Sequence, residues 1–304
     1  MPILSAAVLW GTTGTASWLA PPNAPSAAVG CSGLVLGGLL LFLAGHRGAL
    51  RRPPAGSPLV PNRRRGGAGP AYARGEWRLL LLGAVAVAGY PVTFYPAVAR
   101  TGVAVATVVA LCSAPVFAGA LAWVTGRSRP SARWAIATGA AVLGCAALVL
   151  GPMLTGGPAT IDPFGLALAA LAGFTYVVYS LIGGDLIVRG HRPDSVLGVM
   201  FGVAALLVLP VVLAGDTAWL GSARGAAVAL HLAVFTTFLA YLLFGQGLRH
   251  TGVAVATTLT LAEPAVAAVL GVTVVGERLP LVSWCGLAIL ASGLVLLSLS
   301  PGRR

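Results

Sequence analysis

The chain has 304 residues, of which 58% are hydrophobic and 9% charged, and its mean hydropathy is +0.93. Charged residues make up about a quarter of an ordinary soluble domain, so this composition excludes a water-soluble fold and indicates an integral membrane protein. The net charge is +12, but the basic residues stand between long apolar runs and not on one face among aromatic residues, which argues against nucleic acid as a partner.

Apolar runs long enough to cross a lipid bilayer begin near the N-terminus. A transmembrane helix needs about 20 mainly apolar residues. The first half of the chain has five such runs, at residues 3–20, 26–44, 77–98, 101–125 and 132–150. Residues 46–76 interrupt them with a segment rich in Arg, Pro and Gly, which we expect to be a disordered cytoplasmic loop.

The second half of the chain repeats this plan. A Gly/Pro-rich linker at residues 151–162 is followed by apolar runs at residues 163–183, 195–214, 226–248, 251–275 and 281–298. The sequence therefore predicts an all-α integral membrane protein with about ten transmembrane helices. Very short links, at residues 99–100 and 249–250, predict tight antiparallel hairpins.

An internal repeat relates the two halves. The heptapeptide that starts at Thr101 recurs without change from Thr251, a spacing of 150 residues. Later positions also correspond: Pro115 with Pro264, Gly126 with Gly276, Pro130 with Pro280, and Trp134 with Trp284. A period of half the chain indicates a duplication, so residues 1–150 are predicted to form one five-helix repeat and residues 151–304 the second, together one membrane domain.

The number of helices in each repeat determines their relative orientation. Five is odd, so the second repeat enters the membrane from the opposite side and the two repeats are inverted. Inverted repeats are typical of secondary transporters, whose substrate sites lie between the repeats near the bilayer centre. The pattern therefore predicts alternating access to a small-molecule site.

Arginine supplies the whole basic charge of the chain, because lysine is absent. If the N-terminus is cytoplasmic, 16 of the 19 Arg fall in cytoplasmic segments. Only Arg100, Arg224 and Arg278 fall outside. The positive-inside rule therefore predicts that both termini are cytoplasmic. The use of Arg alone is typical of a GC-rich bacterial genome, so we expect a multi-pass protein of the bacterial plasma (inner) membrane.

Short patterns at defined places in the spans carry a family resemblance: Leu9-Trp10-Gly11, Pro115, Glu263-Pro264 and Gly276-Glu277-Arg278. With the five-plus-five helix plan, they resemble the EamA-type members of the drug/metabolite transporter superfamily. The resemblance covers nearly the whole chain. It implies export of amino acids, metabolites or drugs and does not name the substrate. The family often has an acid after the glycine in the first repeat, where this chain has Gly126-Arg127.

Glu263 is the single acidic residue expected deep in the membrane. A charge there costs on the order of 3 kcal/mol or more. Pro264 follows it and leaves a backbone carbonyl unbonded near Thr260, a break that commonly borders a cavity. Two interpretations stay open. Glu263 either contacts an amine of the substrate or couples transport to protons, or it is a structural residue, neutral or paired within the bundle.

Other candidate substrate contacts are aromatic residues or hydroxyls of the spans. Tyr176 and Tyr179 are three residues apart and should share a helix face. The full predicted set for substrate binding is Trp10, Tyr90, Phe94, Ser113, Tyr176, Tyr179, Phe238 and Glu263, with Pro115 and Pro264 in structural roles. The alternative for each aromatic is packing or interfacial anchoring, and for each hydroxyl a bond within the protein.

Other polar groups suggest no further chemistry. His231 fits a hydrogen-bonded structural residue better than a proton carrier. The four Cys stand alone in separate apolar runs, so we expect no disulfide and no metal site. No cofactor is expected, and the absence of a P-loop argues against ATP-driven pumping. The Gly33/Gly37 and Gly198/Gly202 pairs predict close helix packing, within the protein or in a homodimer.

The predicted function is a secondary transporter that exports small amphipathic metabolites, amino acids or drugs, with lipid bilayer and small-molecule substrate as its partners. The coupling ion would be the proton. An intramembrane transferase acting on lipid-linked substrates is the alternative enzyme hypothesis, but the acids Asp162, Asp185, Asp194 and Asp216 are scattered over different loops. A non-transporting membrane scaffold is the third hypothesis. We therefore predict that the chain is not an enzyme.

Overall fold

The structure is a computed structural model that describes residues 2–22, 24–50, 72–126, 131–154 and 162–298. These residues form helices joined by short links, and no strand occurs among them. The first half contains α1 (Pro2–Trp18), α2 (Ser26–Leu50), α3 (Arg74–Val124) and α4 (Ala132–Leu154). The all-α fold is confirmed.

The second half contains more helical pieces because two of its spans change their hydrogen-bonding pattern. Its order is α5 (Pro163–Val188), α6 (Pro193–Ala214), the short 3₁₀ helix η1 (Ala218–Gly221), α7 (Ala223–His231), the π-helix η2 (Leu232–Leu239), α8 (Ala240–Leu248), α9 (Val253–Leu259), α10 (Ala262–Leu270), the π-helix η3 (Gly271–Val275) and α11 (Leu281–Ser298). α7, η2 and α8 are consecutive in one span, as are α9, α10 and η3.

Within the described part of the chain, eight helices are long and apolar enough to cross a membrane. The predicted number of about ten is reached if α1 is counted as a span and α3 is counted as two spans. α1 has 17 residues and is slightly shorter than those eight. α3 has 51 residues and joins two predicted spans across a single non-helical residue, Gly102.

The predicted disordered loop at residues 46–76 is wrong at both of its ends. α2 continues to Leu50 and α3 begins at Arg74, so both helices extend beyond the apolar runs predicted at residues 26–44 and 77–98. The linker predicted at residues 151–162 is likewise shortened, because α4 continues to Leu154. Residues 51–71 and 155–161 lie outside the described residues.

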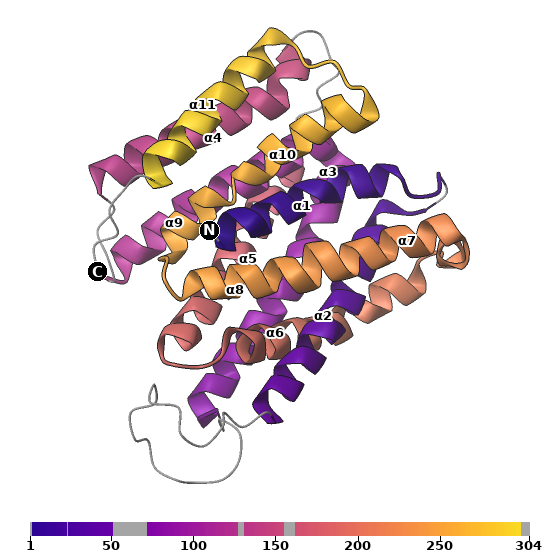
Figure 1. Ribbon diagram of the computed structural model, residues 1–304, viewed down its shortest axis with the longest axis vertical. Helices are drawn as coiled ribbons and strands as arrows, with labels where there is room; N and C mark the ends of the chain where they lie inside the picture. The colour runs from indigo at the N-terminus through magenta and orange to yellow at the C-terminus, as the bar shows by residue number, and fades with distance from the viewer. Residues whose placement is uncertain (1, 23, 51–71, 127–130, 155–161, 299–304) are drawn as a thin grey trace.

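Links between helices gather at two opposite ends of the bundle. At one end, which we call the Pro2 end, α1 begins, and His191 of the α5–α6 link bonds Glu76 near the start of α3, at 3.1 Å. Gln246 and His250, at the link from α8 to α9, line one cavity with Pro2. In Figure 1 this end lies at the left, where α8 meets α9.

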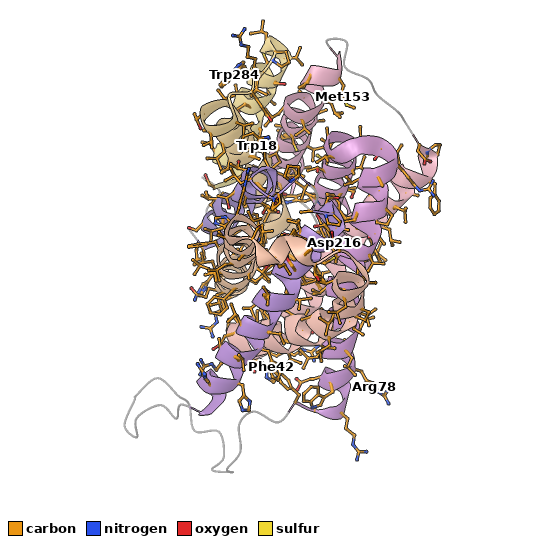
Figure 2. The ribbon with its side chains drawn as sticks, turned by 90° about the vertical axis from the view of Figure 1, so that its right-hand side faces the viewer. Trp18, Phe42, Arg78, Met153, Asp216 and Trp284 are labelled. Atoms are coloured by element: carbon orange, nitrogen blue, oxygen red, sulfur yellow. The ribbon has the colours of Figure 1, made fainter. Side chains whose placement is uncertain are left out.

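The opposite end, which we call the Leu19 end, holds the other set of links. Arg224 at the start of α7 donates a hydrogen bond to the carbonyl of Leu19 after α1. Arg100 before the α3 break forms an ion pair with Asp162 before α5, at 3.1 Å. Figure 2 labels Trp18, Met153 and Asp216, which lie near this end, and Phe42 and Arg78, which lie toward the other. Each span therefore runs from one end of the bundle to the other.

Large apolar side chains are exposed on the outside of the bundle. Examples are Leu81 and Val85 on α3, Leu143 on α4, and Leu206 and Leu213 on α6, each at least half exposed. Such a surface would be unfavourable in water but is the one that lipid tails favour. The chain is a multi-pass membrane protein.

Glycine allows the sharp break in α3. Gly102 has φ 78° and ψ 160°, a backbone region that residues with a Cβ scarcely enter. A Cβ added there would meet no atom within 4 Å, so the requirement is conformational and not steric. The break lies two residues beyond the predicted link at residues 99–100.

We expect Gly102→Ala to lower the free energy of unfolding by about 1 to 3 kcal/mol, because alanine is strained in this conformation. Thermal unfolding of the purified protein in detergent measures the effect. Gly139→Ala in α4 is the matched control, since its Cβ would also meet open space at an ordinary helical φ. Equal stability of the two variants would contradict a strained break at Gly102.

Candidate functional site

The span that carries Glu263 is broken one turn before this residue. α9 ends at Leu259 and α10 begins at Ala262, so Thr260 and Leu261 form a turn inside the span. Pro264 has no N–H to bond the carbonyl of Thr260. That carbonyl accepts instead from the N–H of Glu263 at 3.0 Å. The break lies where Pro264 predicts it, and Glu263 stands in the first turn of α10.

The proline of the first repeat behaves differently. Pro115 lies inside α3, where Gly102 is the one residue with non-helical backbone angles. Both prolines are buried. The duplicated proline thus accompanies a broken helix in one repeat and a continuous helix in the other.

Hydroxyl groups surround the break before α10. Thr260 Oγ1 donates to the carbonyl of Thr257 at 2.8 Å and accepts from the Tyr176 hydroxyl at 3.3 Å. Thr258 and Thr138 bond through their hydroxyls at 3.0 Å. These bonds connect α9 to α5 and α4, so neighbouring helices satisfy the polar groups at the interruption.

A glycine lets α1 approach α10 next to Glu263. A Cβ added to Gly11 would lie 2.6 Å from Cβ of Val266 and 2.9 Å from the backbone oxygen of Glu263. No side chain larger than hydrogen fits at these distances. The contact places Trp10, the residue before Gly11, beside the start of α10.

Trp10 is held by a bond to the π-helix η2. Its indole N–H donates to the carbonyl of Thr236 at 2.8 Å. A π-helix shifts the backbone bonding pattern and is frequent at functional sites. The Trp10 ring lies 5.0 Å from that of Tyr241 and 5.5 Å from that of Phe244. Because the N–H is already bonded, the ring face is what remains for a substrate.

Tyr176 and Tyr179 lie on one face of α5, as their spacing predicts, with ring centroids 5.3 Å apart. The hydroxyls of Tyr179 and Tyr241 bond at 2.8 Å and join α5 to α8. Tyr176 and Tyr179 are only 5% and 3% exposed. Their immediate role in the structure is packing and hydrogen bonding between helices, whereas Tyr241 is half-buried.

The carboxyl group of Glu263 interacts electrostatically with three tyrosines, Tyr90, Tyr176 and Tyr241. Glu263 keeps partial exposure although it lies deep in the bundle. Its side chain forms no hydrogen bond or ion pair within the described part of the chain. Among those residues no group of three His, Cys, Asp or Glu could hold a metal ion. The site thus combines one carboxyl group with three tyrosines that interact with it electrostatically.

The structure brings together Trp10, Tyr176, Tyr179 and Glu263 of the predicted set, and Tyr90 joins them through its interaction with Glu263 and Tyr241. Others lie at the margin. Phe94 stacks on Tyr90 at 5.4 Å but packs against Ala97, Ala106 and Ala169.

Ser113 and Phe238 have mainly structural contacts. The Ser113 hydroxyl donates to the carbonyl of Ala110 at 3.2 Å, within its own helix. Ser113 also faces Gly173 of α5, where no Cβ would fit. Phe238 is half-buried against the main hydrophobic core. The Ser113 hydroxyl forms no hydrogen bond with the carboxyl group of Glu263.

The predicted substrate-binding set lacks three members of this site. Tyr241 bonds Tyr179 and contacts Trp10. Gly11 permits the approach of α1, and Thr260 accepts from Tyr176. Tyr241 lay among the aromatic residues of its span but carried no further sequence signal. Gly11 could have been found, because a glycine directly after a conspicuous tryptophan in a span indicates close helix packing.

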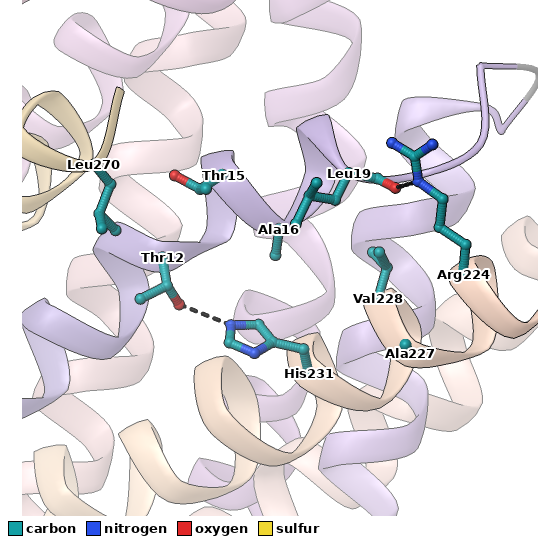
Figure 3. Close-up of a pocket in the computed structure, with 9 residues that line it drawn as sticks. All are labelled: Thr12, Thr15, Ala16, Leu19, Arg224, Ala227, Val228, His231 and Leu270. Atoms are coloured by element: carbon teal, nitrogen blue, oxygen red, sulfur yellow. Dashed lines mark hydrogen bonds between the residues drawn. The ribbon is translucent and has the colours of Figure 1, made fainter. Parts of the chain in front are cut away.

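A separate cavity of about 460 Å³ lies at the Leu19 end, between α1 and α7 (Figure 3). His231 Nε2 bonds the Thr12 hydroxyl at 2.9 Å on one wall. Leu270 of α10 closes another wall, and Arg224 lies at the rim, bonded to the carbonyl of Leu19. The cavity is mainly apolar, and the hydrogen bond of His231 agrees with its predicted structural role.

Comparison with known proteins identifies the family. The model of the EamA-like transporter family matches residues 2–150 and again residues 163–299. The chain belongs to the EamA-like transporter family. The resemblance predicted from the sequence is therefore confirmed, and the two matched segments confirm the duplication. This EamA-like protein is a membrane transporter.

Relatives and solved structures agree with this assignment. An uncharacterized transporter of Bacillus subtilis (strain 168), YwfM, is 35% identical over 99% of this chain and 94% of its own length. An uncharacterized transporter of Clostridium kluyveri is 28% identical over 39% of this chain and 38% of its own length. A crystal structure with 18% identity matches with a TM-score of 0.76 over 98% of this chain and 95% of the other, which shows the fold.

The bond between Tyr179 and Tyr241 can be tested by a double-mutant cycle. We expect Tyr179→Phe and Tyr241→Phe each to lower the stability of the transporter, with a coupling of about 0.6 kcal/mol between them, typical of bonds between membrane helices. Thermal unfolding in detergent provides the four values. Fully additive effects of the two changes would argue against the bond.

Proposed function

We propose that this EamA-like transporter is a proton-coupled secondary transporter that exports small amphipathic solutes, such as metabolites, amino acids or drugs. It would work by alternating access between two inverted repeats. The observation that carries the proposal is the carboxyl group of Glu263, which lies deep in the bundle beside a broken helix and has no partner among the residues that the structure describes.

A carboxyl group kept in this position needs a physical reason. Burial of a charge in an apolar environment is costly, so an unpaired acid is usually neutral there or meets a cation. A substrate amine can supply that cation, and a proton can replace it. Competition of the two for Glu263 would couple the outward movement of solute to the inward movement of protons.

The aromatic residues around Glu263 favour a solute with an apolar or cationic part. Tyr90, Tyr241 and Trp10 are half-buried; Tyr90 and Tyr241 interact electrostatically with the carboxyl group, and the Trp10 ring lies 5.0 Å from that of Tyr241. Aromatic faces attract cations and cover flat apolar groups. An amphipathic amine fits both features of the site.

An inverted arrangement of the repeats is supported by the ends of the spans. Thr101 lies next to Arg100 and the start of α5, at the Leu19 end. Thr251 follows His250, at the Pro2 end. The two copies of the heptapeptide therefore start at opposite ends, as inverted repeats require. Exchange of roles between such repeats would open the Glu263 site to each side in turn.

We also propose that the Pro2 end faces the bacterial cytoplasm. Seven of the ten arginines in the described residues lie at that end, and three, Arg100, Arg224 and Arg278, at the Leu19 end. Basic residues are retained on the cytoplasmic side of bacterial membrane proteins.

Topology is tested with reporter fusions after Arg65 and at the C-terminus. We expect a cytoplasmic signal, fluorescence of a green fluorescent protein fusion, and no alkaline phosphatase activity at either site. A fusion after Asp216 should give the opposite result. Phosphatase activity after Arg65 or at the C-terminus would overturn the proposed orientation.

Proton coupling is tested with Glu263→Gln, which keeps the size and hydrogen bonding of the side chain. We expect the variant to lose pH-gradient-driven transport of a mixed amine library in proteoliposomes, while counterflow exchange persists, because exchange needs no net proton movement. Thermal unfolding is measured beside the flux to show that the fold is intact.

Asp216→Asn is the matched control for this variant. Asp216 is an exposed acid in a link at the Leu19 end, where its carboxylate accepts from the N–H of Ala218 at 2.8 Å. It should keep the flux of the parent protein. If Glu263→Gln transports as the parent does at all pH values, Glu263 is structural and the coupling proposal fails.

A further inference from the structure

A second cavity, of about 560 Å³, opens at the Pro2 end of the bundle. It is distinct from the site around Glu263 and from the cavity between α1 and α7. Its walls come from the start of α1, the start of α6 and the link between α8 and α9. The lining residues used below are Pro2, Arg192, Asp194, Gln246, Arg249 and His250.

Positive charge exceeds negative charge in this cavity. The guanidinium group of Arg192 donates two hydrogen bonds to the carboxylate of Asp194, at 3.1 and 2.7 Å. The charges of these two groups therefore cancel. Arg249 and His250 remain. Their backbone N–H groups close the end of α8, but their exposed side chains form no hydrogen bond or ion pair within the described ranges of the chain.

In the first repeat, the basic residue before the repeated heptapeptide forms an ion pair with an acid. Arg100, which precedes Thr101 as His250 precedes Thr251, pairs with Asp162 at 3.1 Å and lies 4.8 Å from the ring centre of Phe164. That bond holds the pKa of the Asp162 carboxyl below its usual range. Asp162 directly precedes α5, the first helix of the second half.

At the equivalent place in the second repeat, the described residues that line the cavity include one carboxylate, Asp194, which is already paired with Arg192. The first helix of the other half, α1, brings Pro2 to the wall of the cavity. Unlike Arg100, Arg249 and His250 thus have no acid partner among the described residues. An anion from outside the chain would complete the charge pairing of Arg249 and His250.

We propose that this cavity binds a phosphate-type oxyanion. Arg249 would hold two of its oxygens in the forked geometry that guanidinium groups use for phosphates, with His250 and the amide of Gln246 as further donors. The start of α6 also lines the cavity, and there Asp194 Oδ1 accepts from the N–H of Ser195 at 3.1 Å. The oxyanion would be the headgroup of an anionic phospholipid at the membrane surface or a free phosphate.

Binding is measured on the purified full-length protein with three probes: short-chain phosphatidylglycerol, inorganic phosphate, and short-chain phosphatidylcholine as the neutral comparison. Thermal stability and native mass spectrometry report each complex. We expect phosphatidylglycerol to bind and phosphatidylcholine not to bind. Binding of inorganic phosphate as well would assign the site to free oxyanions, and its failure to bind would assign the site to the lipid headgroup.

The variants decide whether the cavity is the site. Arg249→Gln combined with His250→Gln should weaken phosphatidylglycerol binding about tenfold or more, since it removes the charge-assisted bonds. Gln246→Glu leaves both basic residues intact and should weaken binding by adding a negative charge to the cavity. Arg78→Gln, an exposed arginine at the same end outside the cavity, should bind as the parent does.

The proposal is overturned if no anionic probe binds, or if both cavity variants bind as tightly as the Arg78→Gln control. Should the double variant fail to fold, Gln246→Glu alone decides the outcome. The result is independent of transport, because the Glu263→Gln variant should keep the oxyanion affinity of the parent.

Discussion

The close packing of α1 on α10 at Gly11 determines where a polar centre can exist in this bundle. A Cβ at Gly11 would lie 2.6 Å from Val266 Cβ, so only glycine allows the two helices to meet. Their contact brings Trp10 beside the turn that carries Glu263. Without it the carboxyl group would face lipid or a gap, where an acid is costly. The aromatic contacts between α1 and α8 are made by Trp10, next to the same approach.

Backbone satisfaction is the second constraint on the site. Lipid offers no hydrogen bonds, so a helix can break within the membrane only where other protein groups bond its free polar atoms. At the break before α10, the Thr260 hydroxyl bonds the carbonyl of Thr257, and the N–H of Glu263 bonds the carbonyl of Thr260. The helices that hold the break therefore also line the site, where the side chain of Glu263 has no hydrogen-bond partner among the described residues.

Duplication supplied similar backbones, which the two repeats use differently. Gly126 and Gly276 both take left-handed conformations, with φ of 66° and 80°, after corresponding spans. Pro115 nevertheless lies in a continuous helix, whereas Pro264 follows a broken one. Arg100 has an acid partner, and the basic pair Arg249 and His250 faces a cavity. The unpaired charged groups Glu263, Arg249 and His250 thus all lie in the second repeat of the described chain, so the two repeats differ in charge although their backbones are similar.

The sequence by itself determined the membrane character, the duplication, the approximate spans and the break near Thr260. Each of these follows from local properties: apolar length, a repeated heptapeptide, and a proline without an N–H. Only the tertiary structure decided that Tyr241 bonds Tyr179 and that Trp10 bonds the π-helix. The reason is physical. These contacts join residues up to 226 positions apart. They depend on how closely and at what rotation two helices pack, which no periodicity of a single span encodes.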